Sequence, residues 1–270
     1  MGGVDAPIGV FDSGIGGLTV LAALMQALPH ERFMYLGDTA RLPYGTKSAQ
    51  TVGRYAMQAA EALVRHGVKC LVVACNTAAS VGLDAVRTRV GGLPVVGVIE
   101  PGAQAACAAT TTGHIAVIAT EATVRGGAYE RAILARRPDA IVRQLPAQLL
   151  VALAEEGLVD GPVALGVVSY YLGALFAQDP PDTLVLGCTH FPVLAATIRK
   201  VVGPQTSIVD SAQTTAAAVR EQLRAAGIAR TAGSQSLQFM ATDGPERFAR
   251  VGSHFLGRTI DARRIELIDL

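Results

Sequence analysis

The stretch TLVLGCTHF, residues 183–191, runs from a short apolar strand into a glycine, a cysteine, a threonine and a histidine. A second stretch, CLVVACNTAAS, begins at residue 70 and again places a cysteine directly after a short apolar run. A helical pattern follows the cysteine in each stretch, which is Cys188 in the first and Cys75 in the second. The two stretches predict strand–turn–helix units, from which α/β folds with parallel strands are built.

The same alternation continues along the chain. We expect strands at 8–11, 32–37, 70–74, 94–99, 115–120, 141–146, 183–187 and 207–211. We expect helices at 17–28, 48–66, 78–90, 101–111, 123–136, 147–156, 163–177, 192–202 and 212–226. Continuous apolar strands separated by helices are typical of mainly parallel sheets covered on both faces, so the predicted class is α/β with doubly wound topology.

A weak internal repeat indicates how the chain is divided. IGVFDSGIGG, from residue 8, resembles IAVIATEATV, from residue 115, just as the two cysteine stretches resemble each other. We therefore expect two pseudosymmetric α/β domains, formed by residues 1–98 plus 210–270 and by residues 99–209. The tail FLGRTIDARRIELIDL could return to the first domain. Ligands bind at the carboxyl ends of parallel strands, so the active site is expected in the cleft between the domains.

The composition excludes several classes of protein. Half of the residues are hydrophobic, 17% are charged and the net charge is +1, so we expect a globular chain without nucleic-acid partners. The N-terminus lacks the pattern of a signal peptide, and the four cysteines have no secretory context, which predicts a reduced, cytoplasmic protein. The uncharged run at 161–178 contains Gly, Pro, Ser and Gln and is expected to form a buried helix, so we expect no membrane partner.

The cysteines allow several interpretations. A zinc site is poorly supported, because only His190 lies near Cys188 and no CxxC pair is present, so we expect no metal. A Cys/His protease needs one nucleophile rather than two in equivalent places. Cys70 and Cys107 are interpreted as packing residues. Cys75 and Cys188 lie between a strand and a helix, where backbone N–H groups can lower a thiol pKa from about 8.5.

Two thiols on opposite sides of one cleft suit the inversion of a carbon centre. One base removes a proton from one face of the carbon, and a conjugate acid delivers a proton to the other face. A matched pair of acid/base groups can do this in both directions when their pKa values lie near the working pH. No lysine among Lys47, Lys69 and Lys200 lies in a motif that resembles a pyridoxal site, so we expect no cofactor.

Five motifs together resemble those of the glutamate racemase family, a group of cofactor-independent aspartate/glutamate racemases. They are FDSGIGGLTV (11–20), GDTARLPYG (37–45), ACNTAAS (74–80), GVIEPG (97–102) and LGCTHFPVL (186–194). The resemblance covers essentially the whole chain and implies two pseudosymmetric α/β domains with the site between them.

The resemblance also implies roles for single residues. Cys75 and Cys188 match the two catalytic acid/bases, and Asp12 and His190 match residues that assist them. Glu155 matches an acidic catalytic partner of His190, although the adjacent Glu156 is an alternative and Ala152 stands where the family usually has proline. The implied substrate-binding residues are Asp12, Ser13, Tyr44, Gly45, Asn76, Thr77, Thr120, Thr123, Thr189 and His190.

Taken singly, these residues also have simpler interpretations. Asp12 could cap the following helix, His190 could be a hydrogen-bonded turn residue, and Asn76 and Thr77 could be helix caps. DSGIGG lacks the Gly-Lys-Ser/Thr ending of a phosphate loop.

The function that the resemblance implies is interconversion of L- and D-glutamate by a cytoplasmic homodimer. D-Glutamate would supply peptidoglycan, and hence cell wall biogenesis and cell shape. The short segment before the first strand predicts activity without an activator. An aspartate or hydantoin racemase of the same superfamily, and a non-catalytic amino-acid-binding protein on the same fold, remain alternatives.

Overall fold

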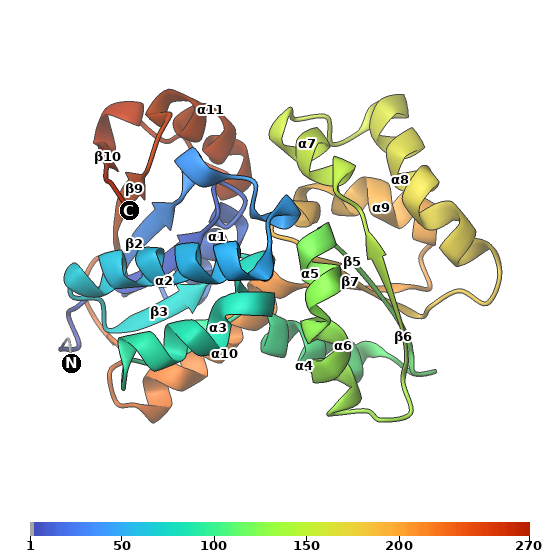
Figure 1. The fold of residues 1–270 in the computed structure, drawn as a ribbon, viewed down its shortest axis with the longest axis horizontal. Helices are drawn as coiled ribbons and strands as arrows, with labels where there is room; N and C mark the ends of the chain where they lie inside the picture. The colour runs from blue at the N-terminus through green and yellow to red at the C-terminus, as the bar shows by residue number, and fades with distance from the viewer. Residues whose placement is uncertain (1–2) are drawn as a thin grey trace.

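The computed structural model describes residues 3–270 as two sheets of parallel strands that lie side by side, each with its own helices (Figure 1). We call them lobe 1, which carries strands β1–β4, β9 and β10, and lobe 2, which carries β5–β8. The strands of lobe 1 are β1 (Ile8–Asp12), β2 (Arg32–Gly37), β3 (Cys70–Val73), β4 (Val95–Gly97), β9 (Ser236–Ala241) and β10 (Ile265–Leu267). Those of lobe 2 are β5 (His114–Ala119), β6 (Ile141–Pro146), β7 (Thr183–Gly187) and β8 (Ser207–Asp210).

Helices connect most successive strands. They are α1 (Leu18–Ala27), α2 (Ala49–Arg65), α3 (Asn76–Val90), α4 (Ile99–Ala109), α5 (Glu121–Gly126), α6 (Ala128–Leu134), α7 (Leu149–Glu155), α8 (Gly161–Ala177), α9 (Ala195–Val202), α10 (Ser211–Ala225) and α11 (Pro245–Leu256). Short 3₁₀ turns lie at η1 (Thr39–Arg41), η2 (Tyr44–Thr46), η3 (Phe191–Leu194) and η4 (Ala262–Arg264). Helix α10 packs against α1 of lobe 1 and α4 of lobe 2, so it links the two lobes.

The strand orders show the internal repeat directly. Lobe 1 has the order β10-β9-β2-β1-β3-β4, and lobe 2 has the order β6-β5-β7-β8. The order β2-β1-β3-β4 is therefore repeated, with β5 equivalent to β1 and β7 equivalent to β3. Since Cys75 follows β3 and Cys188 follows β7, the two cysteines occupy equivalent places, as do Asp12 at the end of β1 and Thr120 after β5.

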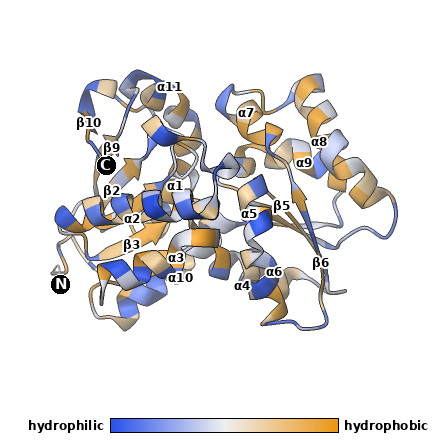
Figure 2. Cartoon of the chain, viewed as in Figure 1, coloured by the Kyte–Doolittle hydropathy of each residue, from blue (hydrophilic) through white to orange (hydrophobic). Residues whose placement is uncertain are grey.

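Three of the central strands are buried along their whole length. Every residue of β1, β3 and β7 is buried, and Figure 2 shows hydrophobic residues on β3 beneath helices α2 and α3, which carry many hydrophilic residues. The edge strand β6 instead mixes exposed and half-buried residues. Uniform burial is expected of a parallel sheet covered on both faces, and it confirms the predicted α/β class.

The structure corrects several expected elements. The helix expected at 123–136 is two helices, because Gly127 adopts a left-handed conformation with φ of 63° between α5 and α6. Strand β9 and helix α11 were not predicted. The tail does return to lobe 1, where β10 pairs with β9. The expected domain boundaries, 1–98 plus 210–270 and 99–209, stay a prediction.

The uncharged run forms α8, but the expectation that this helix is buried was wrong. Only Ala164, Val168 and Leu172 are buried, whereas Val163 and Tyr170 are exposed by 56% and 80%. Among residues 3–270, no helix combines the length and hydropathy needed to cross a membrane. The helix therefore presents an apolar face at the protein surface.

Candidate active site

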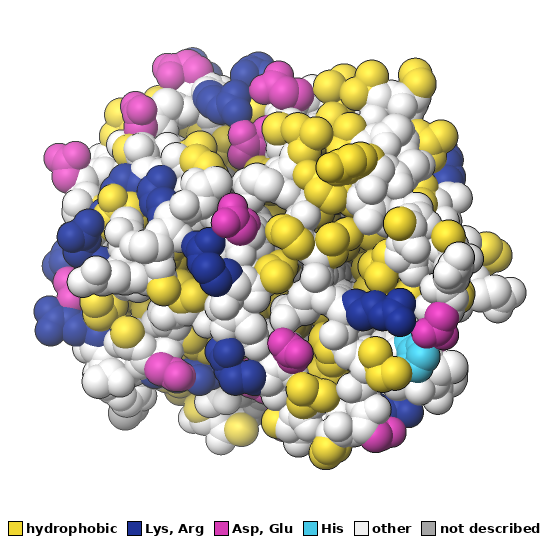
Figure 3. All heavy atoms as spheres, turned by 45° about the vertical axis from the view of Figure 1, so that its right-hand side comes forward, with side chains coloured by type: hydrophobic (Ala, Val, Ile, Leu, Met, Phe, Trp, Pro, Cys, Tyr) yellow, Lys and Arg dark blue, Asp and Glu magenta, His cyan; other side chains and the backbone are white. Residues whose placement is uncertain are grey.

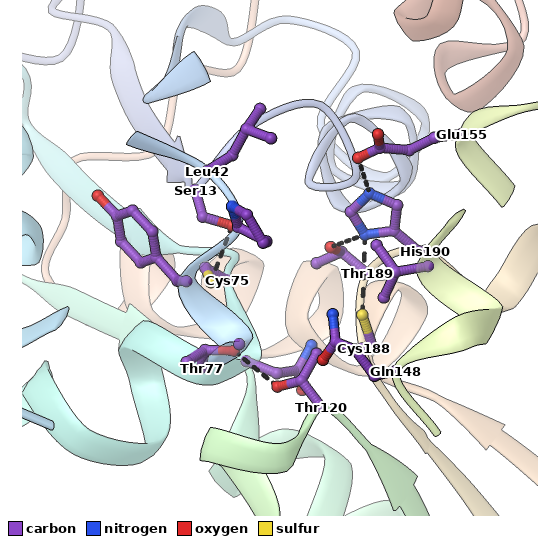
Figure 4. A pocket seen from close by; sticks show the side chains of 16 residues that line it. Ser13, Leu42, Cys75, Thr77, Thr120, Gln148, Glu155, Cys188, Thr189 and His190 are labelled. Carbon is purple, nitrogen blue, oxygen red and sulfur yellow. Dashed lines mark hydrogen bonds and ion pairs between the residues drawn. The ribbon is translucent and has the colours of Figure 1, made fainter. Parts of the chain in front are cut away.

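A small cavity lies where the loops after β1 and β3 of lobe 1 face those after β5 and β7 of lobe 2 (Figure 4). Its volume is about 30 Å³, which is the space of one or two water molecules. An amino acid is larger, so its admission requires the walls to move apart. The walls consist of Ser13, Gly14, Leu42, Pro43, Tyr44, Gly45, Cys75, Asn76, Thr77, Thr120, Gln148, Val151, Glu155, Cys188, Thr189 and His190.

Cys75 forms the lobe 1 side of the cavity as the N-cap of α3. Its Sγ accepts the Ala78 N–H at 3.5 Å and donates to Ser13 Oγ at 3.5 Å. The Ala78 N–H at the helix start acts to lower the pKa of this thiol, as expected, but the net shift is in the other direction. Burial, reinforced by the nearby charge of Asp12, raises the pKa of Cys75 to about 12 and outweighs the favourable hydrogen bonds. Cys75 is therefore a protonated thiol at neutral pH.

Asp12 lies behind the cavity wall rather than in it. Its side chain is completely buried, Oδ2 accepts the Gly14 N–H at 3.0 Å, and Oδ1 has no hydrogen-bond partner. Burial raises the pKa of Asp12, although the charge of His190 and the backbone N–H groups act in the opposite direction. The N-cap of α1 is Gly17, whose backbone N–H acts to lower the pKa of Asp12, so this carboxyl also interacts with the start of the helix.

Cys188 forms the lobe 2 side of the cavity and begins a chain of polar contacts. Its Sγ lies 3.7 Å from His190 Nδ1, and His190 Nε2 lies 3.1 Å from Glu155 Oε1 (Figure 4). Glu155 Oε2 in turn accepts from Arg247 Nη2 at 2.7 Å, on α11 of lobe 1. The chain therefore connects the sulfur to a charged residue on the opposite lobe.

His190 carries a positive charge in this chain. Burial alone would lower its pKa, but hydrogen bonds to Cys188 and Glu155, together with the charges of Cys188 and Asp12, raise the pKa to about 10. The carboxyl of Glu155 has a lowered pKa, because the contacts with His190 and Arg247 outweigh its desolvation. At neutral pH an imidazolium therefore faces the sulfur of Cys188.

The structure also distinguishes the two neighbouring glutamates. Glu155 lines the cavity and contacts His190, whereas Glu156 follows α7 as its exposed C-cap. Of the two, Glu155 is the one in contact with the histidine.

Three threonine hydroxyls join the lobes beside the cavity. Thr77 Oγ1 lies 2.9 Å from Thr120 Oγ1 and 3.2 Å from Thr123 Oγ1. Thr120 and Thr123 are 2.9 Å apart. Thr77 and Thr120 line the cavity, but Thr123 is fully buried and does not. Thr123 therefore lies in position to orient the other two hydroxyls rather than to contact a ligand.

The side-chain amide of Asn76 has an unpaired hydrogen-bond donor. Its Oδ1 accepts from Tyr129 Oη at 2.7 Å, which leaves Nδ2 buried and without a protein partner in the described structure. Thr189 Oγ1 lies 3.4 Å from His190 Nδ1. The wall thus offers hydroxyl and amide groups for an anionic ligand, and none of its residues is Lys or Arg.

Tyr44 and Gly45 come from the loop that closes over the cavity. The Tyr44 hydroxyl bonds to Asp38, so it is occupied on the protein side. A Cβ on Gly45 would lie 2.8 Å from Thr120 Cβ, so only glycine allows this loop to approach lobe 2 so closely.

Five wall residues were not predicted: Gly14, Leu42, Pro43, Gln148 and Val151. The first three belong to motifs that the sequence already singled out. Val151 lies one helical turn before Glu155, a spacing that places both on one face of α7. Gln148 belongs to no motif, and only the tertiary structure shows that it lines the cavity.

Among residues 3–270, no group of three or more His, Cys, Asp or Glu side chains could hold a metal ion.

Comparison with known proteins places the chain among amino-acid racemases. A family model described as Asp/Glu/Hydantoin racemase matches residues 14–219. The chain is 46% identical over 269 residues to a glutamate racemase of Neisseria meningitidis serogroup A, covering 99% of this chain and 98% of the relative. It is 47% identical to the glutamate racemase of Geobacter metallireducens, covering 93% and 92%.

Solved structures show the same similarity. A glutamate racemase of Francisella tularensis in complex with D-glutamate matches with a TM-score of 0.92 at 34% identity, covering 98% of both chains. A glutamate racemase of Thermus thermophilus in complex with beta-chloro-D-alanine has a TM-score of 0.88 at 41% identity, covering 99% and 98%. An aspartate racemase of Picrophilus torridus, at 18% identity and a TM-score of 0.58, shares the fold, covering 82% of this chain and 95% of that one.

The His190–Glu155 pair generates a prediction about pH. Glu155→Gln is expected to lower the pKa of His190 from about 10, because it removes a hydrogen-bonded carboxylate. Folding raises this pKa from 6.5, so the stability that it contributes is fully present below pH 6.5 and is lost as the pH rises through about 10. The wild-type protein should therefore have a higher free energy of unfolding than the variant. This difference should be largest at pH 4.5–6.5, where Glu155 is ionised, and smallest above pH 10.

The measurement is urea unfolding across this pH range, together with NMR titration of the His190 ring. Glu156→Gln is the matched control, since it removes the exposed neighbour and should leave the His190 titration unchanged. Equal shifts in both variants would contradict the pairing of His190 with Glu155.

Proposed function

Because the chain belongs to the Asp/Glu/hydantoin racemase family, we propose that it is a cofactor-independent glutamate racemase that interconverts L- and D-glutamate. The identity of 46% over nearly the full length to proteins of that name supports glutamate as the substrate. The observation that carries the proposal is the presence of Cys75 and Cys188 at equivalent strand ends on opposite walls of one cavity.

The two thiols would act as a pair of acid/base groups. The sulfur of Cys188 faces an imidazolium, which favours its action as the base that removes the Cα proton from one face. Cys75, protonated because its pKa is about 12, would deliver a proton to the opposite face. The reverse reaction exchanges these roles, and Asp12 and His190 would assist the proton movements at their respective sulfurs.

The remaining wall residues would bind and stabilise the substrate. The Cα–H of an amino acid is a much weaker acid than a thiol, so negative charge develops on the substrate during proton removal. Asn76 Nδ2 and the hydroxyls of Ser13, Thr77, Thr120 and Thr189 are neutral donors that can stabilise this charge in a small cavity that excludes water. Tyr44 and Gly45 would close the loop over the bound amino acid.

Aspartate is the second candidate substrate, but its support is weaker. The likeness to an aspartate racemase, at 18% identity, concerns the fold alone. One methylene in a pocket is worth about 1–3 kcal/mol, so aspartate could still be a minor substrate.

The cellular role follows from the product. D-Glutamate is a component of peptidoglycan, so the enzyme would contribute to cell wall biogenesis and cell shape. We place the reaction in the cytoplasm, where the four cysteines would remain free thiols as they are in the structure.

We further infer a homodimer formed through the apolar face of α8 and its neighbours. Figure 3 shows hydrophobic side chains gathered on this part of lobe 2, and Leu149, Leu158, Val163, Leu165 and Tyr170 are exposed there. Helix α8 contains no charged residue. In a dimer with two-fold symmetry, a surface patch contacts the same patch of the second subunit. A patch without charged residues therefore avoids repulsion between like charges.

The cysteine variants test the catalytic assignment. Cys75→Ala and Cys188→Ala should each lower the rate of racemisation by at least about 10²–10⁴-fold, because each removes a positioned acid/base group. Cys107→Ala is the control and should be almost silent, and Cys70→Ala should retain activity, because neither sulfur lines the cavity. Near-normal racemisation by Cys188→Ala, measured with both enantiomers, would reject the two-thiol mechanism.

Solvent isotope incorporation tests whether two bases act. In D2O, newly made D-glutamate should carry deuterium at Cα from the first turnovers, since the delivering thiol exchanges its proton with water. The remaining L-glutamate should stay protiated at low conversion, because the abstracting thiol is a different group. Mass spectrometry of the separated enantiomers measures both. Equal deuterium in substrate and product would indicate a single base.

The dimer interface is tested by charge insertion. Tyr170→Glu should shift the mass measured by light scattering from dimer to monomer, because it would place two carboxylates in the proposed interface. Leu267→Glu, which alters an exposed apolar residue on β10, is the control and should remain dimeric. A monomeric wild type at micromolar concentration would contradict the proposal.

A further inference from the structure

Gln148 is a wall residue whose side-chain amide has an unmet hydrogen-bond requirement. It is the N-cap of α7, but its side chain makes no capping bond. Its Oε1 is buried and has no partner in the described structure. Unpaired buried acceptors are rare because the desolvation penalty of the group is then uncompensated. The oxygen is therefore placed to receive a donor that the protein does not supply.

The surroundings of this amide place it in the cavity wall that also contains both cysteines. Figure 4 shows Gln148 between Cys188 and Thr120, facing the cavity. A Cβ built on Gly45 would lie 2.9 Å from Oε1, so the amide also touches the loop that closes the cavity from lobe 1. A ligand held between the two sulfurs would come within reach of this oxygen.

The two wall groups without hydrogen-bond partners, one a donor and one an acceptor, indicate which kind of ligand they bind. The wall has an unpaired donor, Asn76 Nδ2, and an unpaired acceptor, Gln148 Oε1. An α-amino acid zwitterion offers the complement of both, since its carboxylate accepts hydrogen bonds and its ammonium group donates them. Ionised glutamate has no other hydrogen-bond donor.

We propose that Gln148 is a substrate-binding residue whose Oε1 accepts a hydrogen bond from the substrate ammonium group, so that the site selects amino acids over dicarboxylic acids of the same length. The proposal rests on the proposed function and adds a contact that the sequence motifs do not contain. It also explains why a polar side chain occupies this place in the wall.

The test compares a substrate that has the ammonium group with an analogue that lacks it. Gln148→Met keeps the length of the side chain and removes its hydrogen-bonding atoms. In this variant the KM and the calorimetric Kd for L- and D-glutamate should rise about tenfold or more, the usual effect of losing a hydrogen bond to a charged group. The Ki of glutarate, which lacks the ammonium group, should change less than about twofold.

Gln144→Met is the matched control. Gln144 Oε1 is also buried without a partner, but the residue does not line the cavity, so its variant should leave KM, Kd and Ki unchanged. Thermal unfolding of both variants reports any general loss of structure.

The outcomes separate the two proposals. An unchanged glutamate Kd in a folded Gln148→Met variant would overturn the assignment. A parallel loss of glutamate and glutarate binding would also overturn it, since the amide would then contact a carboxylate through Nε2. A wild type that binds glutamate but does not racemise it would contradict the proposed function, and the calorimetric comparison would still test Gln148.

Discussion

Charges in the interior of this protein are governed by desolvation, because a buried group loses its interaction with water and favours its neutral form unless a partner compensates. Burial raises the pKa of Cys75 and of Asp12, and neither has a cationic partner close enough to reverse the effect. His190 is equally buried, yet its hydrogen bonds to Cys188 and Glu155 keep it protonated. The Cys75 side of the cavity therefore holds a neutral thiol, whereas the Cys188 side holds the imidazolium of His190.

This chemical asymmetry is built on a nearly symmetric framework. The repeated strand order brings Cys75 and Cys188 to equivalent strand ends, so their positions follow from topology alone. What differs is the residue beside each sulfur. Cys75 has the carboxyl of Asp12 nearby, whereas Cys188 has the imidazole of His190. A duplicated scaffold can thus place two identical sulfur atoms, while the side chains beside them give the two sides of the cavity different electrostatic surroundings.

The lobes are held together by contacts that also shape the cavity. Thr77 bonds to Thr120 and Thr123, and the ion pair of Glu155 and Arg247 joins α7 to α11. The same groups orient the wall residues or the histidine. Because the cavity of about 30 Å³ is smaller than an amino acid, we expect it to widen when substrate enters. Closure around the substrate would then exclude water from the reacting atoms.

Much of this arrangement could be predicted from the sequence. The apolar strands, the alternation with helices and the duplicated cysteine stretches determine an α/β fold with two equivalent strand ends, because strand and helix periodicity are local properties of the chain. The burial of Asp12 and the raised pKa of Cys75 required the tertiary structure, since desolvation depends on every neighbouring group. The choice of Glu155 over Glu156, the position of Gln148 and the exposed face of α8 are likewise settled only by packing. Each depends on which side of a helix packs against the rest of the protein, and a change of one residue along a helix turns a side chain by about 100°.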